Sequence, residues 1–112
     1  MSNPVISVTE ALAQLPEHEG KPFATVFSHG SLLVEIFAPR GLDTQQPHSR
    51  DEVYVVIKGD GDFVSGDTRT AFGPGDFIFA AAGTPHRFES FSEDLTVWVM
   101  FYGPEGGESD GD

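Results

Sequence analysis

From residue 23 onward the chain consists of short runs of β-branched and aromatic residues, separated by turns rich in Gly, Pro, Asp and Ser. Such runs are typical of β-strands, and no later window keeps the 3.6-residue period of an amphipathic helix. The pattern predicts an all-β fold with strands at residues 23–27, 31–37, 52–58, 61–65, 68–72, 76–80, 86–91 and 95–102. Eight short strands joined by tight turns favour a double-sheet jelly roll.

The two ends of the chain differ from this β-rich middle. Ser7 and Glu10 have the spacing of a capping box, and the residues after them predict a short helix over residues 8–15, just before Pro16. Residues 103–112 contain four acids and no apolar side chain, which predicts a disordered acidic tail. We therefore expect an N-terminal helix and connector over 1–22, a barrel over 23–102 and the tail over 103–112.

The charge balance limits the partners of the chain. Six Lys and Arg stand against 18 Asp and Glu, which gives a net charge of -12. Such a chain repels polyanions at long range, so we expect neither nucleic-acid nor anionic-membrane binding. The absence of cysteine excludes thiolate metal sites. The sequence has no signal peptide or long apolar stretch, so the expected location is the cytoplasm.

Two short segments contain side chains that ligate metals. The first reads Gln46-x-His48-x3-Glu52-x6-Gly59, and the second reads Gly75-x5-Ala81-x-Gly83-x2-His86-x3-Ser90. Side chains alternate between faces along a strand, so Gln46, His48 and Glu52, all at even positions, are expected to point the same way. With His86 from the second segment, two imidazoles, a carboxylate and an amide would converge inside the barrel. These N and O donors suit a divalent metal.

The two segments resemble the paired motifs of the cupin superfamily, G-x5-H-x-H-x3,4-E-x6-G and G-x5-P-x-G-x2-H-x3-N. The spacing is kept from position 46 onward, and 15 residues separate Gly59 from Gly75. Within the family the chain resembles small single-domain cupins, including those named as tetracenomycin-type polyketide synthesis proteins. The resemblance implies a double-stranded β-helix, or jelly-roll barrel, with one metal ion per chain.

The sequence departs from the cupin pattern at four positions. Gln46 replaces the first His, Gly41 lies one residue closer than usual, Ala81 replaces Pro, and Ser90 replaces Asn. Only the first change affects a metal ligand directly. An amide oxygen is a weaker donor than imidazole, so three roles stay open for Gln46: direct ligand, holder of a metal-bound water, or wall of the site. The donor set suits Zn, Mn, Fe or Ni without selecting one.

The strand parity also predicts which side chains stand beside the metal. Tyr54 shares a face with Glu52 and is the candidate catalytic acid or base, with Glu35 as a more remote second. Together with the ten Phe, such a site would suit an apolar or aromatic small molecule. The opposite face of residues 52–58 is also apolar, so it needs cover from a second subunit or from the N-terminal helix. We expect a homodimer.

Three functional hypotheses follow from this site. The first is a metal-dependent enzyme that acts on a small, aromatic or polyketide-like molecule as a cyclase, isomerase or oxygenase. The second is a non-enzymatic module that binds a small molecule with the support of a metal. The third is a metal-free structural barrel.

Overall fold

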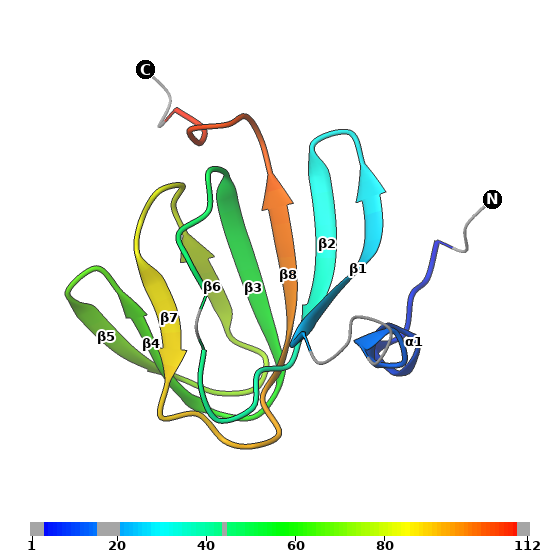
Figure 1. Cartoon of the computed structure of the whole chain (residues 1–112), viewed down its shortest axis with the longest axis vertical. Coiled ribbons are helices and arrows are strands. Elements are labelled where there is room, and N and C mark those ends of the chain that lie inside the picture. Colours follow the sequence, from blue (N-terminus) through cyan, green and yellow to red (C-terminus); the bar gives the residue numbers. More distant parts are fainter. Residues whose placement is uncertain (1–3, 16–20, 44, 110–112) are drawn as a thin grey trace.

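The computed structural model describes residues 4–15, 21–43 and 45–109, and it contains one short helix and eight strands in this part of the chain (Figure 1). The predicted β-rich architecture is therefore confirmed. The elements, in chain order, are α1 (Val8–Leu12), β1 (Phe23–His29), β2 (Leu32–Phe37), β3 (Asp51–Lys58), β4 (Gly61–Ser65), β5 (Thr68–Phe72), β6 (Phe77–Ala80), β7 (His86–Glu89) and β8 (Thr96–Tyr102).

The strands form two antiparallel sheets. The larger sheet has the order β1-β2-β8-β3-β6, and the smaller one has the order β5-β4-β7. The main core contains buried side chains from both sheets, among them Tyr54, Val56, Phe63, Phe88 and Val97. Figure 1 shows β4, β5 and β7 together on one side and β1, β2 and β8 on the other, with β3 between them. The two sheets are thus held together by one apolar core, as in a jelly roll.

The register of β3 fixes which side chains face this core. Glu52 stands opposite Phe101 of β8, and Tyr54 stands opposite Val99. Glu52, Tyr54 and Val56 are only 1–2% exposed, so they form the inner row of the strand. The alternation predicted from the sequence therefore places a carboxylate inside the barrel, where it requires a polar or metallic partner.

Helix α1 covers one end of the outer face of the larger sheet. The capping box is present, because Ser7 Oγ accepts from the Glu10 amide and Glu10 Oε1 accepts from the Ser7 amide. Its buried Ala11 packs in a second cluster with Ala24 and Ile36, which Ile57 and Trp98 join. The helix ends at Leu12 rather than at residue 15. The Gln14 amide already bonds back to Ala11 in a tighter turn, and Pro16 disfavours helical backbone before it.

The described part of the C-terminal segment lies against the barrel. The Gly106 amide donates to the Ser49 carbonyl at 2.6 Å, and the Glu108 amide donates to Asp51 Oδ2 at 2.7 Å. The composition predicts a disordered tail, whereas the described part of this segment is held by hydrogen bonds. Its backbone amides reach the Ser49 carbonyl and the buried Asp51 carboxylate. The hydrogen bonds from Glu108 and Ala82 lower the pKa of Asp51. Among the described residues, no helix is long and apolar enough to span a membrane.

Strand β7 ends at Glu89, two residues earlier than predicted, because the backbone leaves the extended region at the next residue. Ser90 has a φ of 51°, and it is the one described residue other than glycine with a positive φ. Asn adopts this left-handed conformation more readily than Ser does. The Asn that the cupin pattern carries at this position therefore has a backbone reason.

We expect Ser90→Asn to stabilise the fold by about 0.5 kcal/mol, because Asn reduces the strain of the left-handed backbone. Urea unfolding followed by circular dichroism measures this change. Ser65→Asn is the control, since Ser65 ends β4 without a positive φ and should gain no stability. Equal gains in both variants would contradict the explanation.

Candidate metal centre and adjoining cavity

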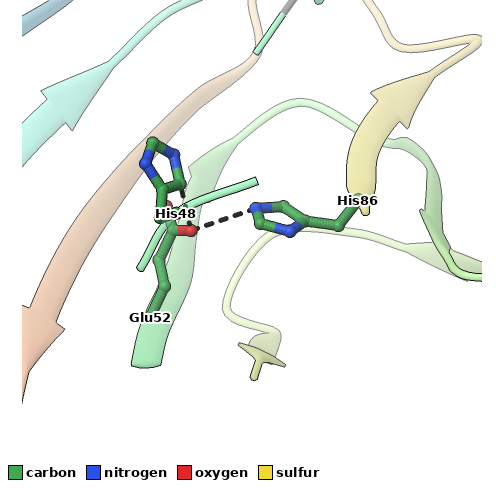
Figure 2. Close-up of side chains that lie close together, drawn as sticks. All are labelled: His48, Glu52 and His86. Carbon is green, nitrogen blue, oxygen red and sulfur yellow. Dashed lines mark hydrogen bonds and ion pairs between the residues drawn. The ribbon is translucent and has the colours of Figure 1, made fainter. Parts of the chain in front are cut away.

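Three ionisable side chains from separate parts of the fold converge at the rim of the barrel (Figure 2). Glu52 comes from β3 of the larger sheet, and His86 is the first residue of β7 in the smaller sheet. His48 lies in the loop before β3, so strand alternation is not what orients it. Instead, the Gly83 amide donates to the His48 carbonyl at 2.8 Å and ties this loop to the turn that leads into His86.

The spacing of the donor atoms suits one metal ion. Glu52 Oε1 lies 3.0 Å from His86 Nε2 and 3.8 Å from His48 Nε2. One donor atom from each of the three residues can be chosen so that all lie within 4.8 Å of one another. Tetrahedral ligands at about 2.1 Å from a metal are about 3.4 Å apart. Small side-chain movements would therefore bring all three donors into bonding distance.

The ring of His86 is already held in an orientation that suits ligation. Its Nδ1 donates to the Thr84 carbonyl at 2.7 Å, which leaves Nε2 facing Glu52. Metal-ligating histidines commonly use a backbone carbonyl in this way to fix the tautomer. Burial lowers the pKa of His86, but the hydrogen bonds with Glu52 and Thr84 outweigh it, and the net pKa is raised.

The fourth predicted ligand is less enclosed. Gln46 is exposed and lines the cavity beside the triad, and none of its side-chain atoms makes a hydrogen bond within the described residues. It is therefore near the site and free to turn toward it. The ligand assignments of Gln46, His48, Glu52 and His86 remain predictions.

A cavity of about 460 Å³ opens beside the three side chains. This volume lies within the usual range for small-molecule sites. The apolar part of its wall consists of Phe23, Leu33, Phe37, Pro47, Val99 and Phe101. Glu35, Arg50, Glu52 and Tyr54 supply charged or polar groups. The cavity thus combines an apolar wall with a few polar groups, a combination typical of sites for organic ligands.

Tyr54 lines this cavity and is held by a polar chain that the sequence did not predict. Its hydroxyl donates to Gln45 Oε1 at 3.0 Å, and Gln45 Nε2 donates to Asp43 Oδ2 at 2.5 Å. The buried Asp43 also accepts from the Phe88 amide at 2.9 Å. Burial and the nearby Glu52 carboxylate raise the pKa of Tyr54 well above its ordinary value. Tyr54 is therefore a neutral phenol whose one hydrogen is donated to Gln45.

The comparison with known families decides what this arrangement represents. The profile described as Cupin domain matches residues 33–102, which include His48, Glu52, His86 and the cavity lining apart from Phe23. The chain belongs to the cupin family. The predicted barrel with a short N-terminal helix is confirmed. Cupins commonly bind a metal at such a site, and His48, Glu52 and His86 lie together where such an ion would sit.

Two relatives match this chain over part of their own length. Uncharacterized protein SCO3923 of Streptomyces coelicolor is 41% identical over 63 residues, which cover 56% of this chain and 60% of that protein. Dimethylsulfoniopropionate lyase DddQ of Ruegeria pomeroyi is 29% identical over 87 residues, 76% of this chain and 42% of the lyase. The cupin therefore spans less than two thirds of either relative.

A solved structure matches most of the chain. An uncharacterized conserved protein with a double-stranded β-helix domain from Klebsiella pneumoniae superposes with a TM-score of 0.71 at 21% identity. The match covers 90% of each chain. At this identity the likeness shows the fold and not the activity.

Proposed function

We propose that this cupin is a divalent-metal-dependent enzyme that transforms a small organic molecule in the cavity beside His48, Glu52 and His86. The observation that carries the proposal is the convergence of two imidazoles and one carboxylate at the edge of a largely apolar cavity. When bound, Zn, Mn, Fe or Ni would supply Lewis-acid polarisation of a ligand oxygen. Tyr54, as a neutral phenol, would donate a hydrogen bond or a proton to the same ligand by turning its hydroxyl hydrogen away from Gln45 Oε1.

Two substrate classes are worth testing first. The phenyl rings of Phe23, Phe37 and Phe101 in the wall favour an aromatic, polyketide-like substrate with cyclase, isomerase or oxygenase chemistry. The likeness to a dimethylsulfoniopropionate lyase favours a lyase reaction on that compound or a related one. The alternative function is a non-enzymatic binding module with the same metal and cavity. The tetracenomycin-type assignment and the cytoplasmic location remain predictions.

Elemental analysis of the purified protein, followed by a turnover screen with each metal, tests this function. We expect close to one divalent ion per chain, and product from at least one of the two substrate classes. A Tyr54→Phe variant should keep its metal and lose most of the turnover. Saturable ligand binding without product would favour the binding module, and wild-type protein that takes up no metal would contradict both.

A substitution at position 46 tests the fourth ligand. We expect Gln46→His to tighten metal binding by about tenfold, because imidazole is a stronger donor than an amide oxygen. Competition with a chromophoric chelator measures the affinity. Gln14→His is the matched control, since residue 14 lies beyond α1 and outside the cavity lining. Unchanged affinity in Gln46→His would assign Gln46 to the cavity wall.

We also propose that two copies associate through the outer face of the larger sheet. Phe77 and Phe79 of β6 are 66% and 48% exposed, and they stand opposite Val55 and Val53 on the face that α1 covers only near Ile57. Large exposed apolar rows of this kind are uncommon on monomers.

Light scattering after gel filtration tests the dimer. We expect twice the 12.1 kDa chain mass for wild type and a single chain mass for the double variant Phe77→Ser, Phe79→Ser. Leu42→Ser is the control, since Leu42 is 74% exposed and lies in the loop between β2 and β3 rather than in β6. A monomeric wild type, or a double variant that remains dimeric, would contradict the proposed interface.

A further inference from the structure

One carboxylate in the cavity takes no part in the metal cluster. Glu35 points inward from β2, opposite Val99 of β8 and Thr25 of β1. Glu52 lies two strands and two residues away from it, which corresponds to about 12 Å between the two Cα atoms. Glu35 therefore stands at the opposite end of the same cavity from the candidate metal ligands.

Few groups near Glu35 can offset the negative charge of its carboxylate. Its neighbours on the inner face of β2 are Leu33 and Phe37. The one side-chain hydrogen bond that it makes within the described part of the chain is long, 3.4 Å, from Thr25 Oγ1 to Oε2. Among the described residues no Lys, Arg or His pairs with it. Burial raises the pKa of Glu35, the Thr25 bond lowers it, and the Glu52 charge raises it further. The ionised carboxylate thus lacks a positive partner.

Among the described lining residues, the one Lys or Arg lies near the other end of the cavity. Arg50 directly precedes β3, and its Nε donates to the Gly103 carbonyl at 3.1 Å. Its Nη2 is buried without a hydrogen-bond partner. With a divalent ion beside Glu52, the cavity would be positive at the Arg50 end and negative at the Glu35 end. A ligand that suits both ends carries an oxygen donor at one end and a cation at the other.

We propose that Glu35 forms a second polar subsite that binds the cationic end, an alkylammonium-type group, of the small molecule held in this cavity. The carboxylate supplies the charge and a free Oε1, and the phenyl rings of Phe23 and Phe37 supply apolar and cation–π contact around it. The net charge of -12 favours the approach of a cation. The proposal rests on the proposed function in assuming that the cavity holds a small molecule, but it does not depend on the metal.

Benzylamine and benzyl alcohol are the probes, since they share a ring and differ in the cationic group. Nuclear magnetic resonance titration of the full chain, as purified and after dialysis against a chelator, measures both dissociation constants. We expect benzylammonium to bind about tenfold more tightly than the alcohol, a typical effect of a hydrogen bond to a charged group. The Phe37 and Val99 amides, which flank Glu35, should shift most.

Two variants distinguish the effect of the Glu35 carboxylate from the effect of the net charge of the chain. Glu35→Gln keeps the size of the side chain, and the preference for benzylammonium should fall to twofold or less. Glu93→Gln removes one charge from an exposed turn, and it should keep the wild-type preference. A wild type that does not prefer the amine, or a Glu35→Gln variant that keeps the preference, would overturn the subsite. After removal of the metal the preference for the amine should persist. A wild type that cannot take up a divalent metal and still prefers the amine would contradict the proposed function and leave the subsite supported.

Discussion

Replacing His86 with alanine should lower the affinity for a divalent metal by about 100-fold or more. The change removes the donor that lies 3.0 Å from Glu52 Oε1 and whose orientation is fixed by the Thr84 carbonyl. Loss of a group that only hydrogen-bonds to a metal ligand typically lowers metal affinity 10- to 100-fold. Loss of a ligand itself should therefore lower metal affinity by at least 100-fold. Competition with a chromophoric chelator, or calorimetry with Zn and Mn, measures the difference.

The controls distinguish a lost ligand from a damaged fold. His29→Ala removes an exposed imidazole at the end of β1, and it should bind metal like wild type. Glu52→Gln keeps the shape of the buried side chain and should also lower metal affinity, because an amide replaces the carboxylate between the two imidazoles. If His86→Ala and Glu52→Gln were folded and bound metal at wild-type affinity, the metal centre would be wrongly placed.

Gly59→Ala should destabilise the fold by about 3 kcal/mol and lower Tm by about 10–15 °C. Gly59 joins β3 to β4 with a φ of 96°, a conformation that side chains rarely adopt. An added Cβ would also lie 2.7 Å from the Leu95 Cα, and backbone at that distance has to move. Leu95 is fully buried, so its displacement would disturb the core beneath both sheets.

A second glycine provides the matched control for the Gly59 variant. Gly66 has a φ of 59°, but an added Cβ there meets open space. Gly66→Ala should therefore lower the free energy of unfolding by only about 1 kcal/mol, the cost of placing a side chain on left-handed backbone. Thermal unfolding of both variants tests the difference. Equal losses of stability in the two variants would mean that the contact with Leu95 adds nothing to the destabilisation by Gly59→Ala.

The strand positions were predictable because the segments whose residues favour strands are also the segments that form the two sheets. β4 and β5 begin and end where the sequence predicts, at the turns around Gly59 and Gly66. Other strand ends differ from the prediction by one or two residues, such as β1, which continues to His29. Two of the differences have local causes: a left-handed Ser90 stops β7, and a tight turn stops α1. Neither cause leaves a periodic signal in the sequence.

The candidate site was predictable in part. Motif spacing identified His48, Glu52 and His86, which the structure brings together. The strand alternation invoked for His48 does not apply, since that residue lies in a loop held by the Gly83 amide. Asp43 and Gln45, which hold Tyr54, were missed because an irregular loop has no period from which side-chain direction follows.

The division of the site between the two sheets has a thermodynamic consequence. The cavity wall comes from the larger sheet and the loop before β3, whereas His86 comes from the smaller sheet. A small molecule that shifts this loop therefore changes the distance from His48 to His86, and the metal ion and the small molecule become reciprocal effectors. By linkage, each must change the affinity of the other by the same factor.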